Sequence, residues 1–161
     1  MDSNSFRDIM GTFATGVTVV TTCVDGLYHG FTANAVCSVA LDPPLLLVCA
    51  DKGGVAHGQL TRAESFGVSI LSAEQETVSN LFASRSEPEA GGMRDLPFRV
   101  GETGAPLLDG ALAWLECRSH SQAEGGDHTI FFGEAVDGGS DAEQDPLLFF
   151  RGGYRFVSPV G

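Results

Sequence analysis

The segment formed by residues 17–24 (VTVVTTCV) and the Asp25-Gly26 pair that follows it restrict the fold of this chain more than any other feature. Val and Thr are β-branched, and their side chains favour a strand over a helix. Asp-Gly is a preferred pair for the two-residue turn of a β-hairpin. The sequence therefore predicts a hairpin whose second strand runs from Leu27 to about Ala35.

A second hairpin is predicted in the later part of the chain. Residues 112–122 (LAWLECRSHSQ) alternate between apolar and polar, residues 124–127 (EGGD) favour a turn, and residues 128–136 (HTIFFGEAV) return. The apolar run 45–50 has the composition of a fully buried strand. Further strands are expected at residues 66–71, 147–150 and 155–157.

Three helices are predicted from periodicity and capping. The first has apolar residues at i, i+3, i+4 and i+7 (Phe6, Ile9, Met10 and Phe13), follows the N-cap candidates Ser3, Asn4 and Ser5, and is expected to end at Gly16. The second opens at Gly53-Gly54 and runs to about Ala63. The third follows the capping box of Ser72 and Gln75 over residues 73–84, with Val78, Leu81 and Phe82 facing inward.

Two segments favour loops. Residues 85–106 hold several Gly and Pro residues and show little periodicity, so they predict a long surface excursion. Residues 133–145 carry five acidic residues and no basic one, which is typical of a solvated loop. With at least six strands in hairpins separated by helices, the chain is expected to be one mainly β domain over residues 1–161, a closed antiparallel β-barrel with peripheral helices.

The charge and apolar content exclude several classes of protein. The chain has 21 acidic and 9 basic residues, a formal net charge of −12, and binding to duplex nucleic acid needs clustered Lys and Arg. No apolar run approaches the roughly 18–20 residues of a membrane span. The first residues lack the pattern of a signal peptide, and no C-x-x-C pair occurs among the cysteines, so a cytoplasmic protein with buried free thiols is expected.

The common catalytic motifs are missing from the sequence. There is no G-x-S-x-G elbow, no Walker loop, and no G-x-G-x-x-G after a predicted strand. The four histidines show no i, i+3 or i, i+4 pairing, so no metal site is expected.

Residues 30–38 (GFTANAVCS) are the segment best suited to hold a ligand. Small residues at a strand end allow a flat ring or a phosphate to approach the backbone, and Thr, Asn and Ser add hydrogen-bonding groups. The same residues also suit an ordinary turn packed against a helix, and composition leaves both readings open.

Three other positions have a functional and an ordinary reading. Residues 52–55 (KGGV) precede a helix and suit an anion site, or form a surface turn. Arg85 either reaches a phosphate or caps helix carbonyls. His128 either faces a bound cofactor or is an exposed residue at a strand start.

Several motifs in uninterrupted order resemble the flavin reductase family, the small NAD(P)H:flavin oxidoreductases that supply reduced flavin to a separate monooxygenase. The resemblance spans residues 6–156 and is carried by FRDIMGTFATGVTVVTT, GFTANAVCSVALDPPLLLVC, FGVSIL, GAPLLDGALAWLEC, GDHTIFFGEAV and PLLFFRGGYRF. It implies an FMN-binding split β-barrel, a homodimer with flavin near the subunit interface, and hydride transfer from NADH or NADPH to FMN or FAD.

The resemblance also implies the residues of the site. The isoalloxazine ring and ribityl chain would contact Thr32, Ala33, Asn34, Ala35, Val36, Ser38 and Val39. The phosphate end would contact Lys52, Gly53, Gly54, Val55, Ser84 and Arg85, where Gly53-Gly54 replace the hydroxyl residues that often follow the lysine. Gln59 and Leu60 would line the same pocket, and His128 would position the nicotinamide near Arg151 and Tyr154. A non-catalytic flavin-binding or electron-carrier protein on the same barrel is the alternative function.

Overall fold

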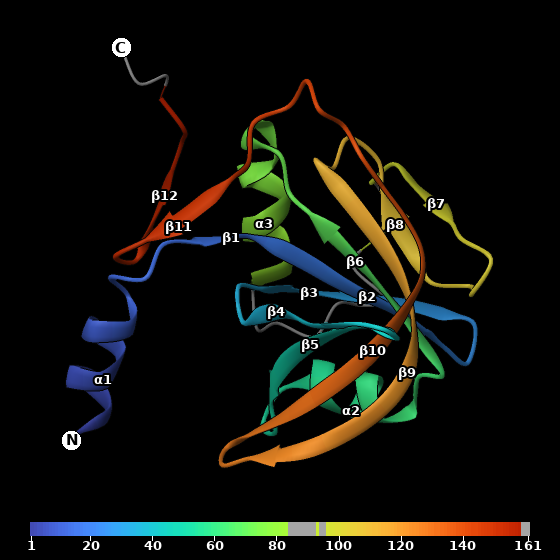
Figure 1. The fold of residues 1–161 in the computed structure, drawn as a ribbon, viewed down its shortest axis with the longest axis horizontal. Helices are drawn as coiled ribbons and strands as arrows, with labels where there is room; N and C mark the ends of the chain where they lie inside the picture. The colour runs from blue at the N-terminus through green and yellow to red at the C-terminus, as the bar shows by residue number, and fades with distance from the viewer. Residues whose placement is uncertain (84–92, 94–95, 159–161) are drawn as a thin grey trace.

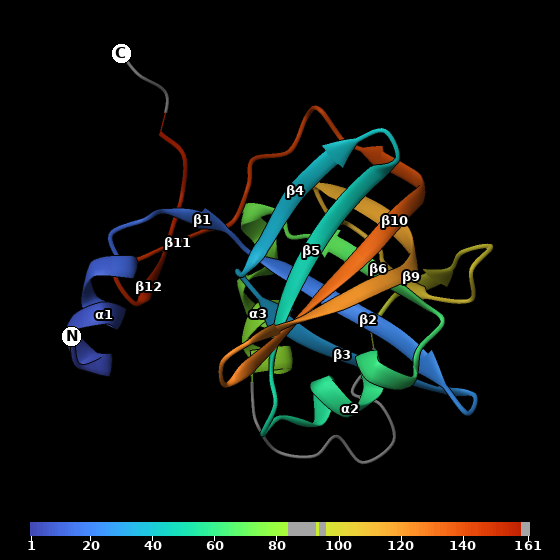
Figure 2. The same ribbon diagram turned by 60° about the horizontal axis from the view of Figure 1, so that its bottom comes forward.

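The computed structural model of the chain describes residues 1–83, 93 and 96–158. Seven strands form the main sheet in the order β3-β2-β6-β9-β10-β5-β4, with every neighbouring pair antiparallel (Figure 1; Figure 2). The strands are β2 (Thr18–Val24), β3 (Leu27–Ala33), β4 (Val36–Leu41), β5 (Pro44–Asp51), β6 (Ser65–Ile70), β9 (Ala113–Gly125) and β10 (His128–Ser140).

Both predicted hairpins are confirmed. Asp25 and Gly26 have φ values of 54° and 75°, the left-handed conformation that a two-residue turn needs, and Val24 pairs with Leu27. Strands β9 and β10 are each 13 residues long. The loop predicted at residues 133–145 is wrong up to Ser140. Register shifts after Phe132 and Ala135 let β10 continue its pairing with β9, with Glu134 half-buried and Asp137 exposed.

The mainly β architecture with peripheral helices is confirmed, but closure of the barrel is wrong. The outer strands β3 and β4 pair with β2 and β5 and not with each other, so the sheet curls without closing. Strand β4 was not predicted as a separate strand. The run at residues 45–50 is not fully buried either: Leu46, Val48 and Ala50 are buried, while the residues between them are half-buried.

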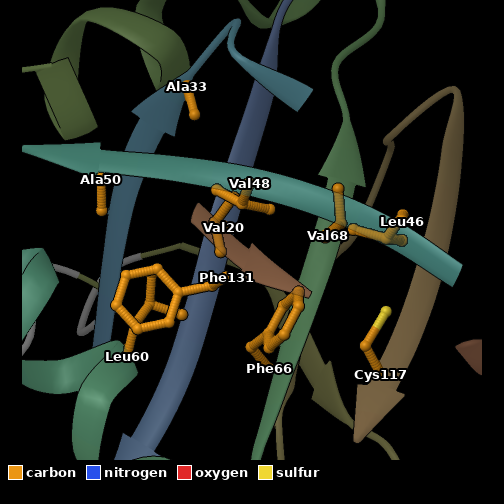
Figure 3. Close-up of a cluster of buried hydrophobic side chains, with 10 residues drawn as sticks. All are labelled: Val20, Ala33, Leu46, Val48, Ala50, Leu60, Phe66, Val68, Cys117 and Phe131. Carbon is orange, nitrogen blue, oxygen red and sulfur yellow. The ribbon is translucent and has the colours of Figure 1, made fainter. Parts of the chain in front are cut away.

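The core inside the curled sheet is made of small aliphatic residues around two phenylalanine rings (Figure 3). Its buried members are Val20, Ala33, Leu46, Val48, Ala50, Leu60, Phe66, Val68, Cys117 and Phe131. A second cluster on the other side of the sheet contains Val17, Val19, Leu71, Phe82, Met93, Leu108 and Leu147. Of the four free cysteines only Cys117 is buried, which corrects the expectation for Cys23, Cys37 and Cys49.

Helix α1 (Ser3–Met10) lies away from the barrel (Figure 1). Asp2, rather than a serine or asparagine, caps it by accepting hydrogen bonds from the amides of Asn4 and Ser5, and the helix ends at Gly11, before the expected Gly16. Its apolar side chains are exposed, by 59% for Phe6 and 55% for Ile9, and Phe13, just after the helix, is 69% exposed. Next to it lies a small sheet of β1 (Thr15–Gly16), β11 (Leu148–Phe150) and β12 (Gly153–Arg155).

The other helices begin where the sequence predicts. Helix α2 (Val55–Arg62) follows the N-cap Gly54, and the capping box of Ser72 and Gln75 starts a 3-10 turn that continues as α3 (Glu76–Ala83). Val78 and Phe82 pack into the second cluster, but Leu81 is 49% exposed, contrary to expectation.

Residues 85–106 are not simply an excursion. Their described part contains β7 (Phe98–Val100), which pairs with β8 (Pro106–Leu108), and Met93, which is buried. No helix in the described part of the chain is long and apolar enough to cross a membrane.

Candidate functional site

A pocket of about 520 Å³ lies along strand β3, between the ends of β5 and α3 and the first turns of α2. Strand β3 is an edge strand, so ligands can reach one side of its backbone. The pocket is lined by Val20, Thr22, His29, Gly30, Phe31, Thr32, Ala33, Asn34, Ala35, Cys49, Ala50, Asp51, Gly53, Gly54, Val55, Ala56, Gln59, Phe82, Ala83 and His128.

One wall of the pocket changes from apolar to polar along the first hairpin. In the β2–β3 register Val20 pairs with Phe31, and two residues further along Thr22 pairs with His29. Alternate residues of a strand share a face, so these two cross-strand pairs lie side by side on the same face. The pocket therefore offers a thin apolar surface next to a group of hydrogen-bonding side chains.

The other wall depends on a close approach between β3 and α3. A Cβ atom on Gly30 would lie 2.6 Å from Cε1 of Phe82, so only glycine allows the ring to cover the strand here. The neighbouring Thr32 hydroxyl donates to the carbonyl of Ser79 at 2.6 Å. The buried Ser79 hydroxyl is in turn hydrogen-bonded to the Tyr154 hydroxyl at 2.8 Å, which links β12 to the pocket strand through α3.

The turn before α2 uses most of its own amide groups. The amides of Lys52, Gly53 and Gly54 donate to the Asp127 carbonyl, the Asp51 carboxylate and the Asp51 carbonyl, at 3.0, 2.8 and 2.9 Å. In the described part of the chain no acceptor faces the amides of Val55 and Ala56, the first residues of α2. Val55 and Ala56 both line the pocket, at a helix N-terminus, where free N–H groups stabilise an anion.

Lys52 does not face the pocket. Its ammonium donates to Oε2 of Glu124 at 2.5 Å and to the Gly126 carbonyl at 2.8 Å, which fastens the β9–β10 turn to the end of β5. The hydrogen bond and charge of Lys52 hold the pKa of Glu124 below its usual value of 4.5.

The Lys52–Glu124 pair predicts a pH dependence that a Glu124→Gln variant lacks. A lowered carboxyl pKa stabilises the folded chain above the unfolded value of 4.5, and this contribution is lost as the pH falls through the lowered pKa. We expect the wild-type chain to be slightly more stable than Glu124→Gln near neutral pH, and equal to it in acid, where the Glu124 carboxyl is protonated in the folded chain as well. Urea unfolding of both chains at the two pH values measures this, and a difference that persists in acid would contradict it.

His128 lines the pocket beside the end of β5. It opens β10, pairs in register with Asp51, and its Nδ1 is 2.7 Å from Oδ1 of Asp127. That hydrogen bond is the main cause of a lowered pKa of Asp127. The imidazole is 44% exposed, so it is accessible to a molecule entering the pocket.

The structure brings together about half of the residues that the sequence analysis assigned to the site. The residues that line the pocket are Thr32, Ala33, Asn34, Ala35, Gly53, Gly54, Val55, Gln59 and His128. The residues that do not line it are Val36, Ser38, Val39, Lys52, Leu60, Arg151 and Tyr154. Ser84 and Arg85 lie outside the described residues.

The residues outside the pocket have other contacts. Leu60 is buried in the main core and Val36 packs against it, because each falls on the inward face of its element. Ser38 and Val39 are exposed on the outer strand β4. The guanidinium of Arg151 lies 5.1 Å from the Phe150 ring centroid, in the turn between β11 and β12. Tyr154 bonds to α3, as described above.

Several pocket residues were not predicted, mainly Thr22, His29, Cys49, Asp51, Ala56 and Phe82. Thr22 and His29 had a usable signal, because counting outward from the Asp25-Gly26 turn pairs them across the hairpin. Phe82 had none, since its approach to Gly30 joins segments 52 positions apart. The described residues contain no group of three or more His, Cys, Asp or Glu that could hold a metal ion.

The sheet is open and antiparallel, and the pocket along its edge strand has thin apolar walls and a helix N-terminus at its border. Such an arrangement suits a flat, anionic small molecule. The family is defined by sequence: residues 10–158 match the model of the flavin reductase like domain, and the chain belongs to this family.

Proteins named as flavin or FAD reductases align with nearly the whole chain. An NADH-dependent FAD reductase of Streptomyces globisporus is 44% identical over 98% of this chain and 87% of its own. A reductase subunit of a flavin-dependent monooxygenase from Rhodococcus jostii is 35% identical over 99% of this chain and 80% of its own. The NADH:FAD oxidoreductase of Streptomyces globisporus C-1027, solved in complex with NAD and FAD fragments, superposes with a TM-score of 0.92 at 42% identity, covering 98% of this chain and 94% of that one.

Proposed function

We propose that this chain is an NAD(P)H-dependent flavin reductase that transfers hydride from a nicotinamide to FMN or FAD and supplies the reduced flavin to a separate monooxygenase. The observation that carries the proposal is the pocket on β3, which joins a thin apolar wall to the free N–H groups of α2. The names of the relatives support the same activity and favour NADH as the donor. The whole chain, residues 1–161, would act as one domain.

The residues present fit a bound flavin. Val20, Phe31 and Phe82 offer apolar surface to a planar ring, and the amides of Val55 and Ala56 offer donors to a phosphate. The flavin and the nicotinamide together supply the redox chemistry when bound. The chain itself orders the two ligands, excludes water and donates hydrogen bonds, so no protein nucleophile is needed.

His128 is proposed to position the nicotinamide from the rim of the pocket. Replacing it with alanine removes one hydrogen-bonding group, worth about tenfold in KM for NADH or in kcat, and should leave flavin affinity nearly unchanged. Steady-state kinetics with NADH and fluorescence titration with FMN measure the two effects. His120→Ala is the matched control, because His120 is exposed and bonds only to its neighbour Ser121. Unchanged turnover of His128→Ala would remove His128 from the proposal.

A homodimer is part of the proposal, and it is supported by the exposed apolar face of α1, which lies outside the barrel with no described residue covering it. A second copy would bury that face. Light scattering should give twice the chain mass, and replacing both Phe6 and Phe13 with serine should reduce the measured mass.

A location in the cytoplasm agrees with the four free cysteines.

The decisive test follows the oxidation of NADH and NADPH by absorbance with FMN, FAD or riboflavin added in turn. Oxidation that depends on added flavin supports a reductase that uses flavin as a substrate. Tight stoichiometric flavin binding with no oxidation of either nucleotide would identify an electron carrier instead. A chain that neither binds flavin nor oxidises NADH would overturn the proposed function.

A further inference from the structure

Three buried polar side-chain atoms without a hydrogen-bond partner belong to residues that line the pocket. Among the described residues, the buried side-chain N and O atoms that lack a hydrogen bond are Thr15 Oγ1, Thr22 Oγ1, His29 Nδ1 and Gln59 Oε1. The last three belong to residues that line the pocket. A buried polar group left unpaired destabilises the folded chain, so three of them in one pocket indicate a site for a ligand.

The hairpin and α2 place the three groups together. Thr22 and His29 are directly opposite each other in the β2–β3 register, and Thr22 is only 2% exposed. Gln59 follows Val55 by four positions, so both lie on the same face of α2, which packs across β2 and β3. The cluster of Thr22, His29 and Gln59 therefore forms a polar end of the pocket, next to the helix N-terminus but distinct from it.

The cluster carries no charge. Burial, together with the nearby positive charge of Arg62, lowers the pKa of His29, so its imidazole is neutral at neutral pH. The threonine hydroxyl both donates and accepts, and Gln59 Oε1 accepts. A phosphate only accepts hydrogen bonds and would leave Gln59 Oε1 unpaired. A hydroxyl group donates and accepts, and it satisfies such a set.

We propose that Thr22, His29 and Gln59 form an uncharged subsite that binds sugar hydroxyl groups. Two sources of this chemistry exist among the ligands of the proposed function, on which this subsite rests: the polyol chain of the flavin and a ribose of the pyridine dinucleotide. The phosphate is held elsewhere, at the free amides of α2. The subsite therefore binds the sugar hydroxyls of the ligand, while other residues contact its aromatic ring and its phosphate.

Thr22→Val and Gln59→Leu test the subsite, since each removes hydrogen bonding at nearly constant size. The probes are riboflavin, which has the polyol chain but no phosphate, and lumiflavin, which has the ring but no polyol chain. We expect each variant to bind riboflavin about five- to tenfold more weakly and lumiflavin within about twofold of the wild-type chain, if the flavin supplies the hydroxyls. If the ribose of the dinucleotide supplies the hydroxyls, each variant binds both flavins as the wild-type chain does, and its KM for NADH rises about five- to tenfold.

Thr61→Val is the matched control, because Thr61 is exposed on α2 and its hydroxyl bonds only to the His57 carbonyl. Thr61→Val should leave the riboflavin affinity, the lumiflavin affinity and the KM for NADH unchanged. Thermal unfolding confirms that each variant is folded. The subsite is wrong if both variants match the wild-type chain with all three ligands, or if they weaken riboflavin and lumiflavin equally. If the wild-type chain binds neither flavin, the proposed function itself is wrong, and the subsite with it. If the wild-type chain binds flavin but the variants behave as described above, only the subsite is wrong.

Discussion

A Gly30→Val chain is expected to bind flavin about tenfold more weakly than the wild-type chain. A Cβ on residue 30 falls 2.6 Å from Cε1 and 2.9 Å from Cδ1 of Phe82, so the ring has to leave its place on the pocket wall. Phe82 is only 7% exposed and belongs to the second core cluster, so it has little free space to move into. Overpacking of this kind costs about 1–3 kcal/mol, and about 1.4 kcal/mol corresponds to tenfold in affinity.

Fluorescence titration with FMN measures the affinity of Gly30→Val, and Gly16→Val is its control. A Cβ on Gly16 has no atom within 4 Å, so the same substitution there should leave binding unchanged. If Gly30→Val binds FMN as well as the wild-type chain does, the Phe82 ring is not a wall of the ligand site. Loss of binding in both glycine variants would point to an indirect cause instead.

A Phe66→Ala chain is expected to lose about 3–5 kcal/mol of unfolding free energy. Phe66 is 1% exposed and lies among Val68, Cys117 and other aliphatic residues inside the curled sheet, as Figure 3 shows. Removing the ring leaves a cavity that strands on several sides cannot close. Urea unfolding measures the change.

The control for the core substitution is Phe156→Ala. The Phe156 side chain is 57% exposed, and its loss should change the unfolding free energy by no more than about 0.5 kcal/mol. A similar loss in both variants would contradict the assignment of Phe66 to the centre of the core. A loss below about 1 kcal/mol for Phe66→Ala would do the same.

Features fixed by neighbouring residues were predicted well from the sequence. The Asp25-Gly26 turn, the capping box at Ser72 and the start of α2 after Gly54 all depend on residues within four positions of each other. Local chemistry determines each of them, so the sequence predicts them without knowledge of the fold.

Features that depend on distant partners were predicted poorly. Closure of the barrel depends on whether β3 meets β4, and no local pattern reports that pairing. The acidic end of β10 has the composition of a loop but is held as a strand by β9. The apolar residues of α1 have helical spacing, and spacing alone does not tell whether they face the core of this chain or solvent.

The candidate site likewise has features that neighbouring residues determine and features that distant partners determine. Thr32, Ala33, Asn34 and Ala35 line the pocket, and a strand end of small residues is visible in the sequence; their contact with a flavin stays a prediction. Lys52 was predicted to contact a phosphate, but its ammonium donates a hydrogen bond to Glu124, 72 positions later in the sequence. The amides of Lys52, Gly53 and Gly54 are already paired through Asp51 and Asp127, and only the folded structure gives the positions of these partners.

Lys52 is the only lysine in a chain of formal charge −12, and its contact with Glu124 leaves it little influence at a distance. Flavin phosphates and pyridine dinucleotides, the ligands of the proposed function, are anions, so the net negative charge of this chain is expected to slow their approach, the reverse of electrostatic steering. Added salt screens that field over a Debye length of about 8–10 Å near physiological ionic strength. The association rate of these ligands is therefore expected to rise with ionic strength.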